Sequence, residues 1–392
     1  MIKIALRRNL IYPIQLIIWS FIRYVEITLL SRKFNFNNSL TFTPLMFLGE
    51  FFSGILVHRY QKGFFEKKQP NPENQNLFNK ILIQERKSFV VTPVDSDYKI
   101  IFLVLVCAIS AFIHYMTKVS IVGKFIKVSS TLQQRLGAVM TILSAIYYVH
   151  VLKLRIFKHQ VFSLIVMGIC IIIILILEFV FQEINIFLSY GEFCFALFIN
   201  FILLFFNTMV DIVEKYLYEY NYVNPFKVLM LEGLCGFIFS LFFFFIPDYL
   251  HDLVEVYNKT TRGEFIFFVV LLVLYFLTCG PRNIFRVITN KLYSPMTRSF
   301  TDYFLNPLYL FFSFLVNNDF ASESEVKRDL YFSFNLILAI IISFFGCVYN
   351  EFIVLNFCGL GFNTYYQITQ RANSCTELNE IIDITEEDLF NN

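Results

Sequence analysis

Long apolar blocks alternate with short polar segments along the whole chain. Each block runs for about 17 residues or more, the length that a helix needs to cross a hydrocarbon core ~30 Å thick. The blocks do not alternate residue by residue, as the strands of a membrane barrel would, and a helix satisfies its own backbone groups inside lipid. The pattern predicts ten membrane-spanning helices, at Leu10–Leu30, Thr41–Val57, Ile100–Met116, Val128–Val151, Val161–Phe181, Ile186–Val213, Phe226–Ile246, Phe265–Ile288, Phe300–Val316 and Leu330–Leu355.

The composition supports this class. Apolar residues make up 57% of the 392 positions and charged residues 16%, whereas a soluble domain usually carries ~25% charged residues. The net charge of +2 gives no strong field that would attract nucleic acid. We therefore expect an all-α polytopic membrane protein with the lipid bilayer as a partner and no nucleic acid.

Lysine and arginine set the orientation. They gather on the side of the N-terminus, above all in the loop 58–99 and in the segment 281–299, and the positive-inside rule places that side in the cytosol. The two N-x-[ST] sequons, at Asn37 and Asn258, then lie on the lumenal or outer side, where glycosylation takes place. Ten spans return the chain to the cytosol, where residues 361–392 would form an acidic tail with Glu377 and Ile381-Ile382 spaced as in an acidic dileucine sorting signal.

Charged residues recur in the same order in the two halves of the chain. In residues 1–182 and 183–360, corresponding spans carry Glu, Glu and Arg in the same succession. Because each half has an odd number of spans, the halves would be inverted relative to one another, which is common among transporters. The recurring residues are Glu26, Glu50 and Arg135 in the first five-helix repeat, and Glu214, Glu232 and Arg298 in the second.

These six residues suggest a pair of gates. Arg135 would close the lumenal side against one of the first-half carboxylates, and Arg298 would close the cytosolic side against one of the second-half carboxylates. Alternating access requires that one gate opens while the other is shut, and an anionic substrate would compete for the guanidinium groups. Structural ion pairs near the helix ends are the competing interpretation of the same residues.

Other charged residues inside the predicted spans should also find partners, because an ionised group in hydrocarbon costs ~2.5–3.5 kcal/mol or more. Arg23 can pair with Glu26 three residues later, and Asp211 with Lys215 four residues later. We expect a structural role for the remaining carboxylates, which are Glu178, Glu192, Asp302 and Glu351. Glycines inside the spans, which allow close helix packing, are Gly49, Gly54, Gly137, Gly233, Gly236 and Gly346.

Catalytic and cofactor motifs are missing from the sequence. The five histidines are scattered, no H-E-x-x-H or Cys-His set has the spacing of a metal site, and no P-loop, G-x-G-x-x-G or G-x-S-x-G occurs. The cysteines form no C-x-x-C pair and lie mostly in apolar runs, where they act as small hydrophobic residues. We therefore expect no enzyme activity, no cofactor and no metal.

Seven segments, spread over most of the chain, carry a resemblance to known proteins. They are Met46–Phe51, Ser129–Val139, His159-Gln160, Val213–Tyr216, Asn224-Pro225, Leu231–Phe237 and Ser294–Asp302. Together they resemble the drug/metabolite transporter superfamily (EamA-like), and within it the F-type members of the solute carrier 35 family. The resemblance implies ten helices in two inverted five-helix repeats, cytosolic termini and a central cavity. It also implies that Glu50, Arg135, Glu214, Glu232 and Arg298 line or gate that cavity.

The sequence thus predicts a secondary transporter that moves a small anionic or polar metabolite, nucleotide-sugar-like or phosphorylated, by alternating access. The expected location is an endomembrane, such as the Golgi or an endosomal or lysosomal membrane. A scaffold or receptor that keeps the transporter fold but moves nothing is the alternative, and a membrane enzyme acting on a lipid-linked substrate is a weaker one. A small-molecule substrate is the expected partner, and the sequence leaves a homodimer open.

Overall fold

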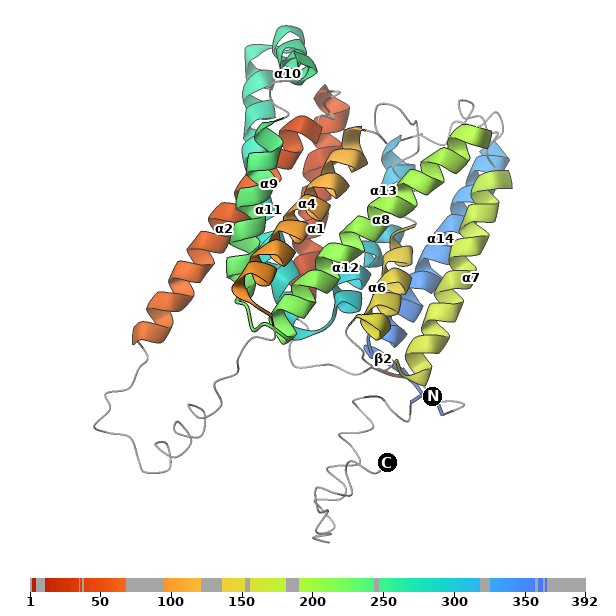
Figure 1. Cartoon of the computed structure of the whole chain (residues 1–392). Coiled ribbons are helices and arrows are strands. Elements are labelled where there is room, and N and C mark those ends of the chain that lie inside the picture. The colour runs from red at the N-terminus through yellow and green to blue at the C-terminus, as the bar shows by residue number, and fades with distance from the viewer. Residues whose placement is uncertain are drawn as a thin grey trace, which may run out of the picture.

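A computed structural model describes most of the chain. The described residues are 2–4, 11–34, 36, 39–67, 95–120, 136–151, 156–180, 190–242, 247–317, 325–356, 359–361 and 364. They form a bundle of helices that run roughly side by side (Figure 1).

Seven helices in this part of the chain are long and apolar enough to cross a membrane. Their presence makes the chain an integral, multi-pass membrane protein, as the sequence predicts. These helices are α1 (Ile11–Phe34), α2 (Ser39–Lys67), α4 (Asp97–Ser120), α7 (Lys158–Val180), α8 (Tyr190–Glu219), α11 (Arg262–Leu292) and α14 (Glu325–Tyr349).

The other three predicted spans fall on shorter helices, so the count of ten stays a prediction. The fourth falls on the 3-10 turn η3 (Leu136–Ala138) with α6 (Val139–His150), and the seventh on α9 (Pro225–Leu241). The ninth is broken at Leu305 into α12 (Pro295–Phe304) and α13 (Asn306–Asn317), with Pro307 in the first turn of α13. One more helix, α10 (Pro247–Lys259), lies between α9 and α11 and had not been predicted.

Local signals fix where several helices begin. The Asn224 side chain accepts a hydrogen bond from the Phe226 amide, and Pro225 opens α9. Thr261 and Glu264 form a reciprocal capping box at the start of α11, and Ser294 caps α12. Each cap satisfies backbone N–H groups that the helix itself leaves without acceptors.

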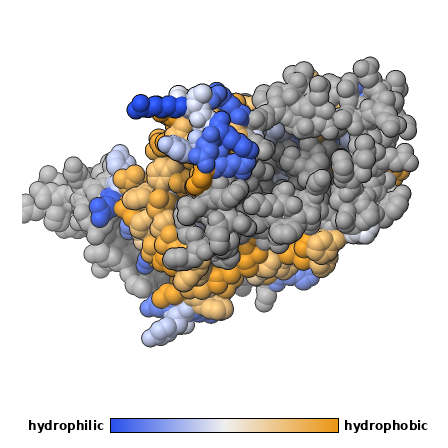
Figure 2. Space-filling view, turned by 90° about the horizontal axis from the view of Figure 1, so that it is seen from above, coloured by the Kyte–Doolittle hydropathy of each residue, from blue (hydrophilic) through white to orange (hydrophobic). Residues whose placement is uncertain are grey.

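The outer faces of the helices are apolar. Along α7, Ile165, Ile169, Ile172 and Ile176 are each more than half exposed. Their spacing of four, three and four residues places them on one face of the helix. Figure 2 shows that hydrophobic side chains make up much of the coloured surface of the bundle. A soluble protein would bury such a face, so this one is suited to lipid.

The interior of the bundle is organised by pairs of packed helices. α2 packs along α9, and α7 packs along α14. α1 packs along α11, while α4 packs along α8, and α6 packs on α12. α2 also contacts α11, and α4 also contacts α9, so α2 and α9 lie at the centre of one half of the bundle.

Glycines permit the closest of these contacts. A Cβ atom on Gly233 of α9 would lie 2.5 Å from the Phe51 backbone nitrogen of α2. A Cβ atom on Gly54 of α2 would lie 2.9 Å from the Met230 backbone nitrogen of α9. The two helix backbones therefore approach each other to a distance that only glycine allows, which is the packing role predicted for these residues.

A short two-stranded sheet joins the two ends of the described chain. β1 (Ile2–Ile4) pairs antiparallel with β2 (Ile353–Leu355), with Ile2 opposite Leu355. Figure 1 shows β2 and the N-terminus at one end of the bundle, and α10 at the opposite end. The apolar pattern places Ile353–Leu355 in the tenth span, Leu330–Leu355, but α14 ends at Tyr349 and these residues form a strand. A strand of only three residues beside a long apolar helix gives no signal of its own in the sequence.

Polar contacts at the strand end of the bundle tie α4 to α8. The Asp95 amide donates to the Asn221 side chain at 2.9 Å, and Asn221 Nδ2 donates back to Asp95 Oδ2 at 3.0 Å. Asp95 precedes α4, and Asn221 follows α8. Hydrogen bonds from Lys99 and then from Asn221 hold the pKa of Asp95 below its usual value.

The loop assigned to 58–99 is shorter than predicted, because α2 continues to Lys67 and α4 begins at Asp97. Pro44 lies within the early part of α2, which begins at Ser39. The sequon Asn37, Arg135 and the tail beyond residue 364 lie outside the described residues.

Substitution of Gly233 by Ala should destabilise the bundle by about 1–3 kcal/mol, because the new methyl group would overlap the α2 backbone. Thermal unfolding of the detergent-solubilised protein measures this. Gly263→Ala is the control, since nothing lies within 4 Å of a Cβ atom there. Equal effects of the two substitutions would contradict the proposed contact.

Asn258 should carry a glycan, because it is exposed in α10 at the end of the bundle opposite the paired strands (Figure 1). Asn258→Gln and Thr260→Ala should each abolish this glycan in protein expressed in eukaryotic cells. The loss is measured as faster migration on a gel. Thr260→Ser, which keeps the sequon, should retain it. Labelling of residue 258 from the cytosolic side would contradict this orientation.

Candidate cation-lined cavity

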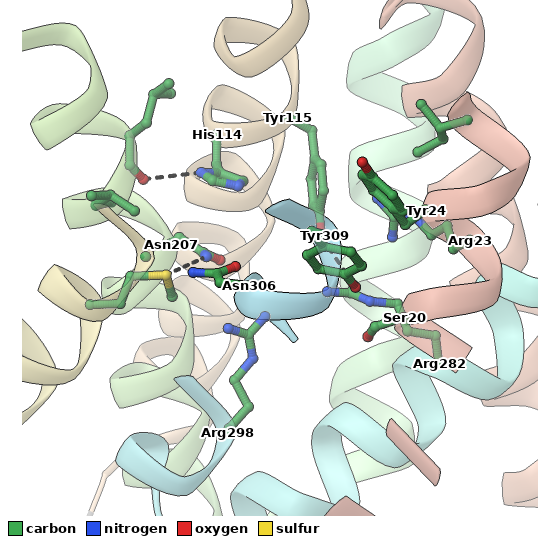
Figure 3. A pocket seen from close by; sticks show the side chains of 15 residues that line it. Ser20, Arg23, Tyr24, His114, Tyr115, Asn207, Arg282, Arg298, Asn306 and Tyr309 are labelled. Atoms are coloured by element: carbon green, nitrogen blue, oxygen red, sulfur yellow. Dashed lines mark hydrogen bonds between the residues drawn. The ribbon is translucent and has the colours of Figure 1, made fainter. Parts of the chain in front are cut away.

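A cavity of about 200 Å³ lies inside the bundle (Figure 3). Eight of the described elements contribute to its wall, namely α1, α4, η3, α6, α8, α11, α12 and α13. The residues that line it are Ser20, Arg23, Tyr24, Ile27, His114, Tyr115, Gly137, Met140, Leu203, Leu204, Asn207, Arg282, Arg298, Asn306 and Tyr309.

The wall of the cavity is cationic. Three arginines, Arg23, Arg282 and Arg298, line it from three different helices, and no Asp or Glu is found among the described residues that line it. Hydroxyl, amide and imidazole groups fill the wall between them (Figure 3). Guanidinium groups bind carboxylates and phosphates in bidentate geometry, so the wall is suited to an anion.

Arg23 is placed by aromatic rings. Its guanidinium carbon lies 5.8 Å from the centre of the Tyr115 ring and 5.5 Å from that of Tyr275, within the range of cation–π attraction. Its Nη1 atom is buried, and no acceptor for it is found in the described part of the chain. Arg23 was predicted to pair with Glu26, but Glu26 instead accepts a hydrogen bond from the Thr278 hydroxyl at 2.7 Å.

Arg282 and Arg298 are held by hydrogen bonds and by charge. Arg282 Nη1 donates to Asn283 Oδ1 at 2.9 Å and more weakly to the Tyr115 hydroxyl at 3.4 Å. Arg298 Nη1 lies 3.2 Å from Asp211 Oδ2, and both side chains are almost completely buried. In Figure 3 the Arg298 guanidinium points toward Asn306 and Asn207.

An ionic network lies beside the cavity on the side of the paired strands. Arg286 of α11 contacts two carboxylates, Glu214 Oε1 of α8 at 2.9 Å and Glu232 Oε2 of α9 at 3.1 Å. Asn290, one turn further along α11, donates to Glu214 Oε2 at 2.9 Å and to the Asp211 carbonyl. Three helices are thus joined by charged groups that are at most 5% exposed.

Lys215 completes this network at the end of α11. Its ammonium group donates to the carbonyl oxygens of Lys291 and Tyr293, at 2.8 and 3.3 Å. These carbonyls belong to the C-terminal end of the helix, where backbone acceptors lack intrahelical partners and the helix dipole favours a cation. Lys215 also pairs with Glu219 at 2.7 Å, so the predicted pairing of Lys215 with Asp211 is wrong.

The gate partners differ from those predicted from the sequence. Arg298 pairs with Asp211 and not with Glu214 or Glu232, the predicted partners, which both contact Arg286 instead. Glu50 is buried on α2, at 3% exposed. Of the predicted substrate-binding or gating residues that the structure describes, only Arg298 lines the cavity. Arg135, the predicted partner of Glu26 or Glu50, lies outside the described residues.

Arg282 and Arg286 were missed because they were counted as basic residues of a cytosolic segment. The helix α11 instead continues to Leu292, through Pro281, and buries both side chains. The spacing of polar residues could have predicted that the helix continues. Directly after the apolar run, polar side chains recur every four residues, at Arg282, Arg286 and Asn290. Such spacing places them on one face of a helix.

Other polar residues of the predicted spans lie at different places in the structure. His114 lines the cavity, and its Nδ1 atom lies 3.0 Å from the Leu203 carbonyl oxygen. Glu351, expected to be structural, lies 3.4 Å from His159 Nε2. The side chains of Glu178, Glu192 and Asp302 lie outside the described part of the structure.

In comparisons with known proteins, the sequence matches no family model and no curated protein. The resemblance to the drug/metabolite transporter superfamily therefore stays a prediction. The cavity and the ionic network are interpreted from their own geometry.

Substitution of Arg286 by Gln should destabilise the protein by about 3–5 kcal/mol, because it leaves two buried carboxylates without a cation. Chemical unfolding in detergent, followed by circular dichroism, measures this loss. Lys259→Gln breaks an exposed pair with Glu255 and should cost about 0–1 kcal/mol. A similarly small effect of Arg286→Gln would show that the network does not hold the helices together.

Proposed function

We propose that the chain is a secondary transporter that carries a small anionic metabolite across an endomembrane by alternating access. We further propose that it has the architecture of the drug/metabolite transporter superfamily, with ten spans in two inverted five-helix repeats. The cation-lined cavity is the observation that carries the proposal. The topology, the packing and the broken helices support it.

The cavity supports an anionic substrate. Burying three guanidinium groups in the middle of a membrane protein is costly, and the described residues that line the cavity with them include no carboxylate. A phosphate or carboxylate group in the cavity would place a negative charge beside these three cations. The volume of about 200 Å³ is below that of typical pockets for drug-sized ligands, ~300–1,000 Å³. In this conformation it suits a sugar phosphate better than a whole nucleotide sugar.

The paired strands support an even number of membrane crossings. β1 and β2 are hydrogen-bonded to each other, so residues 2–4 and 353–355 lie on the same side of the membrane. Seven long helices alone would place them on opposite sides. The shorter helices must therefore supply an odd number of further crossings, and α6, α9 and the pair α12–α13 would supply three.

The packing of the helices supports two related halves. With ten spans, a shift by five exchanges α1 with α8, α2 with α9, and α4 with α11. Under this exchange the α1–α11 contact becomes the α8–α4 contact, and both are observed. The α2–α9, α7–α14 and α6–α12 contacts each map onto themselves, as expected for helices that meet across a pseudo-two-fold axis.

Interrupted helices at the cavity also support transport. Gly137 lies in the turn η3 before α6, and Asn306 lies where α12 ends and α13 begins, and both residues line the cavity. Non-helical backbone at membrane depth is tolerated where it faces a cavity, and transporters use such interruptions at their substrate sites. In this structure the two interruptions belong to the corresponding spans of the two proposed repeats.

Two barriers of different chemistry flank the cavity. The strand end is closed by the ionic network around Arg286. The opposite end is closed by an aromatic cluster from α1, α2, α11 and the link between α1 and α2, which includes Phe34, Phe36, Phe42 and Phe268. Alternating access would require each barrier to open in turn, and the ionic one contains charged groups that an anion or a proton can compete for.

Purified protein in liposomes should exchange radiolabelled glucose 6-phosphate, with UDP-glucose as a second test substrate. Arg23→Gln should weaken substrate affinity about 10- to 100-fold, because it removes a charged hydrogen-bond donor worth ~1.5–3 kcal/mol. Affinity is measured as the half-saturating concentration for exchange.

Lys33→Gln is the matched control, since Lys33 is an exposed cation on the same helix and contacts the Phe267 ring. Its exchange should equal that of the unmodified protein. If no labelled anion exchanges and none raises the unfolding temperature, the transport proposal fails and a scaffold with a transporter-like bundle becomes the better explanation.

A further inference from the structure

Glu50 differs from the other buried carboxylates around the cavity. Glu26 accepts a hydrogen bond from Thr278, Asp211 contacts Arg298, and Glu214 and Glu232 both contact Arg286. Glu50 is only 3% exposed, yet within the described part of the chain no donor reaches its carboxylate. An ionised carboxylate in such a position is costly, and binding a proton removes that cost.

The charged groups near Glu50 come from every helix around it. From α11, Arg282 and Arg286 attract its negative charge, and Arg23 of α1 does so more weakly. Glu214 of α8 and Glu232 of α9 repel it. The neutral titratable groups in the same field are the Tyr115 hydroxyl of α4 and the Cys279 thiol of α11.

These neighbours divide into two sets. Arg286 forms ion pairs with Glu214 and Glu232, so its positive charge is shared between these two carboxylates and Glu50. Arg23 and Arg282 are the guanidinium groups that also line the cavity. Besides Arg286, the ionised form of Glu50 is therefore stabilised by two cations that face the cavity.

An anion in the cavity would change this balance. Its negative charge would lie against Arg23 and Arg282 and would cancel much of the attraction that these residues exert on Glu50. A nearby negative charge favours the protonated form of a carboxyl group. Anion binding and proton binding would then strengthen one another, and by linkage the effect is reciprocal.

We propose that Glu50 is a proton-binding site and that the protein takes up its anionic substrate together with this proton. The inference rests on the proposed transport function, which it extends from the substrate to the coupling ion. No covalent step is involved: one proton moves from water to a Glu50 carboxylate oxygen and returns to water on the other side.

The direction of the pH effect follows from this coupling. Acidic conditions protonate Glu50, so the affinity for the anion should rise as the pH falls. Glu50→Gln imitates the protonated form and should bind the anion tightly at every pH, with no dependence on a pH gradient. Glu50→Asp keeps a carboxyl group and should retain the pH dependence.

The test uses the full-length protein in lipid and glucose 6-sulfate as the probe. A sulfate ester keeps its charge over the whole neutral range, whereas a phosphate monoester has a second pKa near ~6 and would itself titrate. Infrared spectroscopy follows the C=O band of protonated carboxyl groups as the pH is changed. The pH dependence of probe affinity is measured in parallel.

The matched control is Glu264→Gln. Glu264 is an exposed carboxylate on α11, and Gln can keep its place in the capping box. We expect a protonated-carboxyl band that Glu50→Gln removes and Glu264→Gln keeps. The probe should shift its titration to higher pH and raise the proton affinity about 5- to 150-fold, the range of typical coupling between sites.

Two outcomes overturn the proposal. One is a band without any contribution from Glu50. The other is a Glu50 band that a transported probe does not shift, together with anion affinity that is equally pH-dependent in Glu50→Gln. A Glu50 band in a protein that exchanges no anion would instead refute the transport function and leave the proton site standing, so the two failures can be told apart.

Discussion

The contact of one guanidinium group with two carboxylates inside the bundle is the interaction on which the rest of the structure depends. Arg286 brings together Glu214 of α8 and Glu232 of α9 from its own position on α11. On a water-exposed surface such ion pairs contribute little. In hydrocarbon an unpaired charge is so unfavourable that the helices carrying these groups must meet. The same constraint turns the isoleucine face of α7 outward and the polar groups of α8, α9 and α11 inward.

The ionic network also determines where the cavity lies and which side of it is closed. Asn290 and Lys215 bind the last turns of α11 to α8, and Arg298 joins α12 to the same helix through Asp211. This end of the bundle is therefore held by directional contacts between charged groups. The other end is held by packed aromatic rings, whose contacts are weaker individually and less directional. A bundle built in this way has a chemical difference between its two barriers, and the proposed substrate and proton both act on the ionic side.

The two proposals share a single balance of charge. Arg23 and Arg282 face the cavity, and they also supply part of the positive potential at Glu50. An anion that binds to them changes the environment of a carboxylate that it never touches. Such coupling needs no movement of the backbone, only groups close enough to feel one another's charge in a medium of low dielectric constant.

The sequence by itself determined the class of the protein and the position of most of its helices. Hydrophobicity and helix capping act over a few residues, so the apolar blocks locate α7 and α8, and Thr261 with Glu264 locates the start of α11. Which charges meet depends on which helices pack together, and only the tertiary structure decided that. In the tertiary structure Arg298 pairs with Asp211, and Arg286 pairs with Glu214 and Glu232. Glu50 accepts no hydrogen bond on its carboxylate in the described part of the chain. The tertiary structure also paired β1 with β2 across almost the whole length of the chain, because contacts between distant residues are set by the fold and not by local pattern.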